Sequence, residues 1–318
     1  MSSKTPLRRA PRFVAELDEA GLGAVDAVRV SERKSNLWLD AWRDLRGRWM
    51  FWLAGAVILL LIVVAAFPGL FTQVDPRACA LKFSNDPPTD GHPLGFTFQG
   101  CDIYSRIIHG TSTSLMVGLL VTIIVAIIGI LVGAFAGFFG GWLDSLLMRV
   151  GDMFFAIPYI LAAVVIMSMF LADRNILVIS MAIGFFAWPS TARILRSEVL
   201  RVKNADYVMA SEALGVSKVR TMLTHVLPNS IAPVIVVSTV GLAAAITAEA
   251  TLSFLGVGLP SNLYLSWGNE ISFAQERLRT DPMPLIYPSI ALSVTVLSFI
   301  MLGETVRDAL DPKARALR

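Results

Sequence analysis

The chain has 318 residues, of which 55% are hydrophobic and 16% charged, and its mean hydropathy is +0.66. Soluble domains carry about 25% charged residues, and the apolar residues here form runs longer than a globular core requires. The composition therefore excludes an ordinary soluble domain and predicts an all-α, polytopic membrane protein. Three scattered histidines and two cysteines argue against a metal centre or a disulfide scaffold, so we expect no cofactor.

The first 49 residues are expected to form a tail on the cytoplasmic side. Residues 1–30 mix proline, arginine and acidic residues without periodicity, which is typical of a flexible segment. Residues 36–49 predict an amphipathic helix on the inner leaflet or, alternatively, the cytoplasmic end of the first membrane span. Apolar side chains recur there near helical spacing: Leu37, Leu39, Trp42, Leu45 and Trp49.

Six apolar runs are candidates to cross the bilayer, whose hydrocarbon core of about 30 Å takes about 20 helical residues. The first begins near Met50, too far from the N-terminus for a cleavable signal peptide, so we expect it to be retained. The runs cover residues 52–67 and approximately 115–138, 150–171, 176–189, 231–256 and 285–303. They predict a transmembrane domain over residues 50–303 and a cytoplasmic C-terminal tail over residues 304–318.

The second run carries Gly129, Gly133 and Gly137, which lie four residues apart. Small residues at this spacing let the backbones of two membrane helices approach closely. The glycines therefore predict a helix-packing face rather than a pore lining.

The distribution of lysine and arginine predicts the orientation in the membrane. With both termini in the cytoplasm, 21 of the 27 basic residues lie on the cytoplasmic side, and the opposite orientation would invert this bias. We therefore expect an outer loop over residues 68–113 and a cytoplasmic loop over residues 192–228.

The outer loop contains both cysteines, Cys79 and Cys101, on the oxidising side of the membrane. A disulfide between them would close a loop of about 22 residues and stabilise the fold by roughly 3 kcal/mol through chain entropy. The alternative is a pair of free thiols. We favour the disulfide because both cysteines share one loop and the chain has no others.

The cytoplasmic loop is polar but helical in pattern, which favours a docking surface for a soluble partner over a solvated connector. Asp206 is placed to cap a short helix, and Gly215 would end it because glycine readily adopts the left-handed conformation. Ser217 is placed to cap a second helix over residues 218–226. The first helix carries a small apolar face at helical spacing: Ala210, Ala213 and Leu214.

The segment from Ala210 to Gly215, followed by Leu227 and Pro228, resembles the loop shared by permease subunits of ABC importers. The usual pattern is Glu-Ala-Ala, three residues, Gly, nine residues and Ile-x-Leu-Pro. This chain departs from that pattern at three positions. Met209 stands in place of the Glu, Ser211 in place of the second Ala, and His225 in place of the Ile.

Further segments resemble the dipeptide/oligopeptide permeases, and specifically the second (C-type) of their two permease subunits, over about residues 35–315. The matching motifs are HPLG at 92–95, GCDIYSR at 100–106, MRVGD at 148–152, LSFLGVG at 252–258, SWGN at 266–269 and LGETVRDALDP at 302–312. The outer signature usually reads Gly-Arg-Asp where this chain has Cys101 in the middle position. The resemblance implies a type I ABC importer permease fold with six transmembrane helices in the bacterial plasma membrane.

The resemblance also implies the partners. The chain would form half of a translocation pathway with a B-type permease subunit, served by two ATPase subunits or a fused ATPase and by an extracytoplasmic solute-binding protein. No GxxxxGK[S/T] motif occurs in the sequence, so the chain is not expected to hydrolyse ATP, and no nucleic acid is expected. The residues expected to dock into an ATPase cleft are Tyr207, Met209, Ala210, Ser211, Glu212, Ala213, Leu214 and Gly215.

Two acidic residues within the spans are candidates for the translocation path, because charge inside a membrane usually has a function. Asp152 lies near the inner end of the third span, where an ion pair with Arg149 is the favoured alternative. Glu249 lies about 18 residues into the fifth span and hence roughly 27 Å along its axis, toward the outer side. Packing against Thr247 and Thr251, or snorkelling to the interface, is the alternative for Glu249.

The main rival reading is a secondary transporter, which would need buried charge relays and repeat-related broken helices. Intramembrane charge is sparse and no repeat is evident. A stand-alone channel and an intramembrane enzyme are further alternatives, although the paired ligands or nucleophile–base pairs of an enzyme are missing from the sequence. Within the permease family, the substrate could be a dipeptide, an oligopeptide, a nickel chelate or haem.

Overall fold

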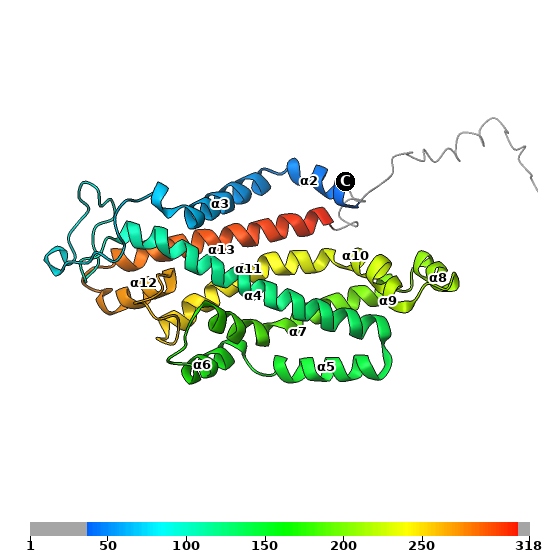
Figure 1. The fold of residues 1–318 in the computed structure, drawn as a ribbon. Helices are drawn as coiled ribbons and strands as arrows, with labels where there is room; N and C mark the ends of the chain where they lie inside the picture. The colour runs from blue at the N-terminus through cyan, green and yellow to red at the C-terminus, as the bar shows by residue number, and fades with distance from the viewer. Residues whose placement is uncertain (1–36, 311–318) are drawn as a thin grey trace, which may run out of the picture. The chain divides into compact units, whose positions relative to one another are not determined.

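A computed structural model of the protein describes residues 37–310, and over this range the chain is helical (Figure 1). The expected flexible segment 1–30 and the end of the C-terminal tail lie outside the described residues. No strand occurs between residues 37 and 310, where the only β-type pairings are two isolated bridges. The α-helices are α2 (Leu37–Arg46), α3 (Trp49–Ala66), α4 (Ile103–Phe139), α5 (Gly141–Phe155), α6 (Tyr159–Met169), α7 (Ile176–Val202), α8 (Asp206–Ala213), α9 (Lys218–Thr221), α10 (Leu227–Ser230), α11 (Ala232–Phe254), α12 (Trp267–Ala274) and α13 (Met283–Leu310).

Short helical turns complete the described chain. A π-helical turn joins α9 to α10 at Met222–Val226. The 3₁₀ turns are Pro68–Leu70, Leu81–Phe83 and Gln275–Arg277.

Five of these helices are long and apolar enough to cross a membrane: α3, α4, α7, α11 and α13. A sixth span is formed if α5 and α6 are counted together, since this pair is bent by 74° at a short break. The third predicted run is therefore broken rather than continuous. The break ends at Pro158, which cannot donate a backbone hydrogen bond to a continuing helix.

Two predicted spans are longer in the structure. The second begins at Ile103 instead of near residue 115, because the Asp102 carboxylate caps the helix by accepting from the Ser105 amide at 2.7 Å. The fourth continues through Pro189 and ends at Val202. Hydropathy marks only the apolar part of a helix, so the polar turns at these helix ends did not register in the sequence pattern.

The glycine face predicted on α4 is confirmed, and it packs against α7. A Cβ atom added at Gly133 would lie 2.5 Å from the Ala192 carbonyl oxygen. A Cβ at Gly129 would lie 2.8 Å from Thr191, and one at Gly137 2.8 Å from Val199. Only glycine permits this approach of the two backbones.

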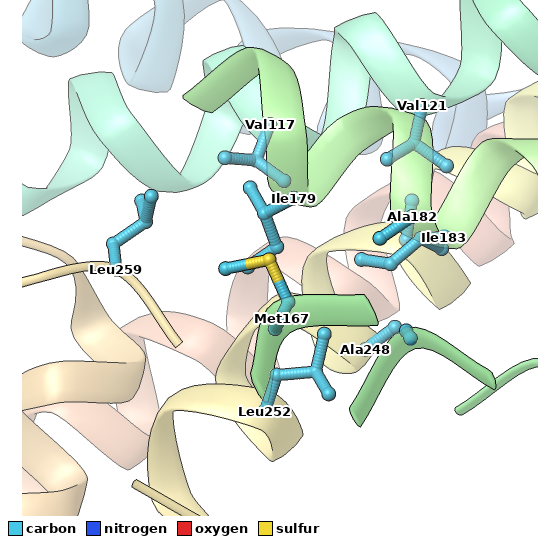
Figure 2. Packing of buried hydrophobic residues seen from close by; sticks show 11 residues of the cluster. Val117, Val121, Met167, Ile179, Ala182, Ile183, Ala248, Leu252 and Leu259 are labelled. Carbon is cyan, nitrogen blue, oxygen red and sulfur yellow. The ribbon is translucent and has the colours of Figure 1, made fainter. Parts of the chain in front are cut away.

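The largest buried cluster joins α4, α6, α7 and α11 (Figure 2). Val117 and Val121 of α4 lie over Ile179 and Ile183 of α7, and Met167 of α6 fills the space beside them. This cluster ties the shorter arm of the bent span to the α4–α7 pair.

The predicted amphipathic segment forms a separate helix, α2, which ends at Arg46 before α3 begins at Trp49. Its buried face, Ala41 and Leu45, packs against Ala309 near the end of α13. The Arg48 guanidinium donates to Asp308 at 2.7 Å and to Asp44 at 2.8 Å. The helix is therefore attached to the end of α13; its position on the inner leaflet stays a prediction.

Candidate functional site

The loop between α7 and α11 forms the short helix α8, a sharp turn, and a second helical segment that leads into α11. Figure 1 shows α8 at the opposite end of the helix bundle from α12. Asp206 is not the N-cap that the sequence suggested, because Ala205 holds that position and Asp206 is the first helical residue. A carboxylate in the first turn still interacts favourably with the helix dipole.

The predicted helix stop at Gly215 takes the form of a Schellman motif. Gly215 has φ +81°, in the left-handed region. Its amide donates to the Glu212 carbonyl oxygen at 2.9 Å, and the Val216 amide donates to that of Ser211 at 3.2 Å. These bonds satisfy the last carbonyls of α8 and fix the direction in which the chain leaves the helix.

One face of α8 is anchored in the membrane domain. Val208 is buried in a cluster that includes Leu195 and Val199 of α7 together with Met222 and Val226 of the π-helical turn. Ser211 is also buried, and its hydroxyl lies 3.3 Å from that of Thr221. The coupling set proposed from sequence is thus divided, since Ser211 faces inward.

The opposite face of α8 is exposed and mainly apolar. Leu214 is 85% exposed, Met209 53% and Tyr207 49%. The remaining exposed members of the predicted docking set are Ala210, Glu212, Ala213 and Gly215. An exposed apolar surface on a short helix is suited to binding in a cleft of another protein.

A second candidate site is a pocket of about 350 Å³ between α4, α7, α11 and the bend that joins α5 to α6. It was not predicted, because its walls come from four segments that are far apart in the sequence. Its lining residues are Val121, Thr122, Val125, Phe155, Ile157, Pro158, Tyr159, Ile183, Phe186, Ala187, Pro189, Ser190, Thr191, Val237, Ser238, Gly241, Ala244 and Ala245.

Asp152 lies next to this pocket. The sequence suggested an ion pair with Arg149, but the structure does not form it. The Asp152 carboxylate accepts from Arg193 of α7 at 2.7 Å. The Arg193 guanidinium also stacks on the ring of Phe155, 4.3 Å from its centroid. The pairing with α7 was missed because Arg193 is 41 residues away in sequence.

Glu249 is completely buried, which contradicts a role in lining an open path in this conformation. One carboxylate oxygen accepts from the hydroxyls of Ser253 at 2.9 Å and Ser266 at 2.8 Å, and the other faces the Ser114 hydroxyl at 3.5 Å. The suggested partners Thr247 and Thr251 instead donate to carbonyls of their own helix. The carboxylate therefore joins α4 and α11 to the start of α12.

A buried ion pair holds α12 against α4 at the end of the bundle opposite α8. Arg106 donates to both carboxylate oxygens of Glu270 at 2.7 Å, and the two side chains are 8% and 6% exposed. Arg106 also donates to the Pro76 carbonyl oxygen at 3.1 Å, which fixes the first long loop. Residues 106 and 270 are 164 positions apart, so local pattern gave no sign of the pair.

The same loop contains the two cysteines, and the structure joins Cys79 to Cys101 in a disulfide. Cys101 is buried and directly precedes Asp102, which caps α4. The disulfide therefore attaches the loop close to the first turn of α4.

Comparison with known proteins gives two family matches. Residues 129–316 match the family described as the inner membrane component of binding-protein-dependent transport systems. Residues 36–88 match the N-terminal transmembrane domain of oligopeptide transport permease C.

Individual relatives align over nearly the whole chain. The chain is 33% identical over 298 residues to the oligopeptide transport system permease protein OppC of Bacillus subtilis (strain 168), covering 94% of this chain and 97% of that protein. It is 32% identical over 280 residues to the dipeptide transport system permease protein DppC of Alkalihalophilus pseudofirmus, covering 88% and 91%. It is also 32% identical over 298 residues to the glutathione transport system permease protein GsiD of Escherichia coli O157:H7, covering 93% and 97%.

The buried pair Arg106–Glu270 allows a stability prediction. Arg106→Met leaves the Glu270 carboxylate buried without its partner, which we expect to cost about 3–5 kcal/mol. The double variant Arg106→Met with Glu270→Leu removes both charges and should recover most of that loss. Thermal unfolding of the detergent-purified protein measures both effects. Equal melting temperatures for the single and double variants would contradict the assignment of a buried, mutually dependent pair.

Proposed function

Because this chain belongs to the family of inner membrane components of binding-protein-dependent transport systems, we propose that it is the C-type permease subunit of an ABC importer for dipeptides or oligopeptides. The relatives that align over nearly its full length are permeases for oligopeptides, dipeptides and glutathione, which is itself a small peptide. The substrate class follows from these relatives. The mechanical role rests on the geometry of α8.

An importer needs parts that this chain does not supply, beginning with the site that hydrolyses ATP. The sequence has no phosphate-binding Gly-x-x-x-x-Gly-Lys-Ser/Thr motif, so ATP hydrolysis belongs to ATPase partners. The chain contributes five continuous spans and one bent span, which we assign as half of the pathway, with a B-type permease subunit supplying the other half. A solute-binding protein would deliver the peptide to the end of the bundle that carries α12.

The orientation follows from charge. The positive-inside rule places α8, α2 and both termini in the cytoplasm, and the loop with the Cys79–Cys101 disulfide on the outer side, where disulfides persist. In this orientation α2 lies at the inner surface, with exposed Trp38, Leu39 and Trp42 able to enter the lipid interface.

The observation that carries the mechanism is the two-sided character of α8. Its exposed apolar face, centred on Leu214, would enter a cleft of an ATPase subunit. Its buried face joins the cluster of Val208, Val199 and Val226, which continues into α7 and α11. Movement of the ATPase would therefore be passed to the helices that surround the pocket, so that ATP binding and hydrolysis alternate its access between the two sides.

Transport by the complete importer tests this function. Proteoliposomes that contain both permeases and the ATPase subunits, supplied with the binding protein and ATP, should accumulate a labelled dipeptide or oligopeptide. Replacing the ATPase subunits by catalytically inactive variants should abolish uptake. Uptake that persists with inactive ATPases would identify a secondary transporter or a channel. Uptake of a nickel chelate or haem in place of peptide would refute the proposed substrate.

Gly215 allows a separate test of coupling. Gly215→Val forces a β-branched residue into left-handed backbone geometry, so we expect peptide uptake to fall at least about tenfold while membrane insertion is retained. A Cβ at this position meets no atom within 4 Å, so the effect would come from the backbone and not from a clash.

The matched control is Gly215→Asn, because asparagine tolerates the left-handed region. It should retain most of the uptake and most of the ATP hydrolysis stimulated by the binding protein. Normal uptake by Gly215→Val, or equal loss in both variants, would count against a coupling turn at this position.

A further inference from the structure

The pocket between α4, α7, α11 and the α5–α6 bend has an uncharged lining. Among its lining residues none is acidic or basic, and the polar ones carry hydroxyl groups. The Thr122 hydroxyl donates to the Gly118 carbonyl oxygen at 2.8 Å, and that of Ser190 donates to the Ala187 carbonyl oxygen at 3.3 Å. These two hydroxyl groups are bonded within their own helices, whereas Tyr159, Thr191 and Ser238 add further neutral hydroxyl groups to a lining that is otherwise mostly carbon.

The inner wall of the pocket is part of the rigid core. Val121 of α4 and Ile183 of α7 line it and also belong to the largest buried cluster, where Figure 2 shows them on neighbouring helices. At about 350 Å³ the pocket lies at the lower end of the range of about 300–1,000 Å³ that is typical of small-molecule sites. The pocket is therefore preformed and has room for a bulky side chain together with part of the peptide backbone.

Gly241 of α11 opens the pocket on a second side. Gly241 lies in a membrane helix and lines the pocket, and a Cβ atom added there would meet nothing within 4 Å. At Gly118 and Gly184, by contrast, a Cβ would lie 2.5 Å from Ile246 and 2.8 Å from Ile124. Helix packing therefore explains those two glycines but not Gly241, whose lack of a side chain adds free space to the pocket.

Charged groups begin at the edge of the pocket. Phe155 is a lining residue, and the Arg193 guanidinium that pairs with Asp152 stacks on its ring. Each of these two charges already has its partner. A charged side chain that entered the pocket would lose its hydration without gaining an opposite charge, which is costly, whereas an apolar side chain gains from leaving water.

We propose that this pocket is a subsite that holds one neutral, apolar side chain of a peptide in transit, and that Gly241 sets the size it accepts. The inference rests on the proposed function and adds to it a preference within the peptide substrates. The permease would contribute to selectivity in addition to the solute-binding protein.

The test uses the complete transporter in proteoliposomes and four tripeptides, Ala-X-Ala with X alanine, leucine, phenylalanine or glutamate. Uptake by the Gly241→Leu variant is divided by uptake by the unaltered protein for each peptide, so that the selectivity of the binding protein cancels. The leucine side chain introduced at position 241 would occupy part of the pocket. In a hydrophobic site, one methylene group alone changes the discrimination between substrates by about tenfold or more. We expect uptake of the leucine and phenylalanine peptides to fall at least about tenfold, and that of the alanine and glutamate peptides, whose side chains do not fill the pocket, to change less than about twofold.

Two further variants keep the test decisive. Gly241→Ala adds a single methyl group and should give a smaller loss in the same order, phenylalanine before leucine before alanine, without threatening the fold. Gly55→Leu on α3 is the matched control, since a Cβ there also meets nothing within 4 Å but Gly55 does not line the pocket. It should leave all four ratios near one.

The outcomes separate the two proposals. An equal loss for all four peptides, no loss for any, or the same pattern in Gly55→Leu would overturn the subsite while leaving peptide import intact. Failure of the unaltered transporter to take up any of these peptides in the presence of ATP and binding protein would instead overturn the proposed function, and the subsite with it.

Discussion

The close contact between α4 and α7 is the interaction on which the rest of this structure depends. In lipid, helices gain little from the hydrophobic effect, so they associate by van der Waals packing and polar contacts. Gly133 brings the α4 backbone so close to α7 that a single added Cβ would lie 2.5 Å from the Ala192 carbonyl oxygen. Helix α6 packs on this pair through Met167, and α11 completes the group through Leu252.

Polar and apolar contacts at the two ends of the bundle join this group of helices to the surfaces proposed for the partners. At the α12 end, the charges of Arg106 and Glu270 and the buried Glu249 carboxylate join α4, α11 and α12. At the α8 end, Lys203 donates to the Gly137 carbonyl oxygen at 2.9 Å, and Val208 enters the cluster shared by α4, α7 and α11. The same helices thus connect the surface proposed for the ATPase, the pocket, and the surface proposed for the binding protein.

Features encoded in short segments could be predicted from the sequence, and features made by distant residues could not. Hydropathy located the spans, the glycine spacing identified the packing face of α4, and Gly215 marked the end of α8 because its left-handed geometry is a local property. The partners of Asp152 and Glu249 were predicted wrongly because nearby residues were considered, whereas the structure uses Arg193 and serines from three segments. The pocket was missed for the same reason.

Photo-cross-linking measures directly whether the exposed face of α8 enters an ATPase subunit. A photoreactive amino acid would replace Leu214, which is 85% exposed, and in a parallel sample Phe98, which is 45% exposed in the loop before α4. After illumination of the assembled transporter, we expect an adduct with the ATPase from position 214 and none from position 98. An adduct of position 214 with the binding protein, or no ATPase adduct from that position, would contradict the docking of α8 into the ATPase.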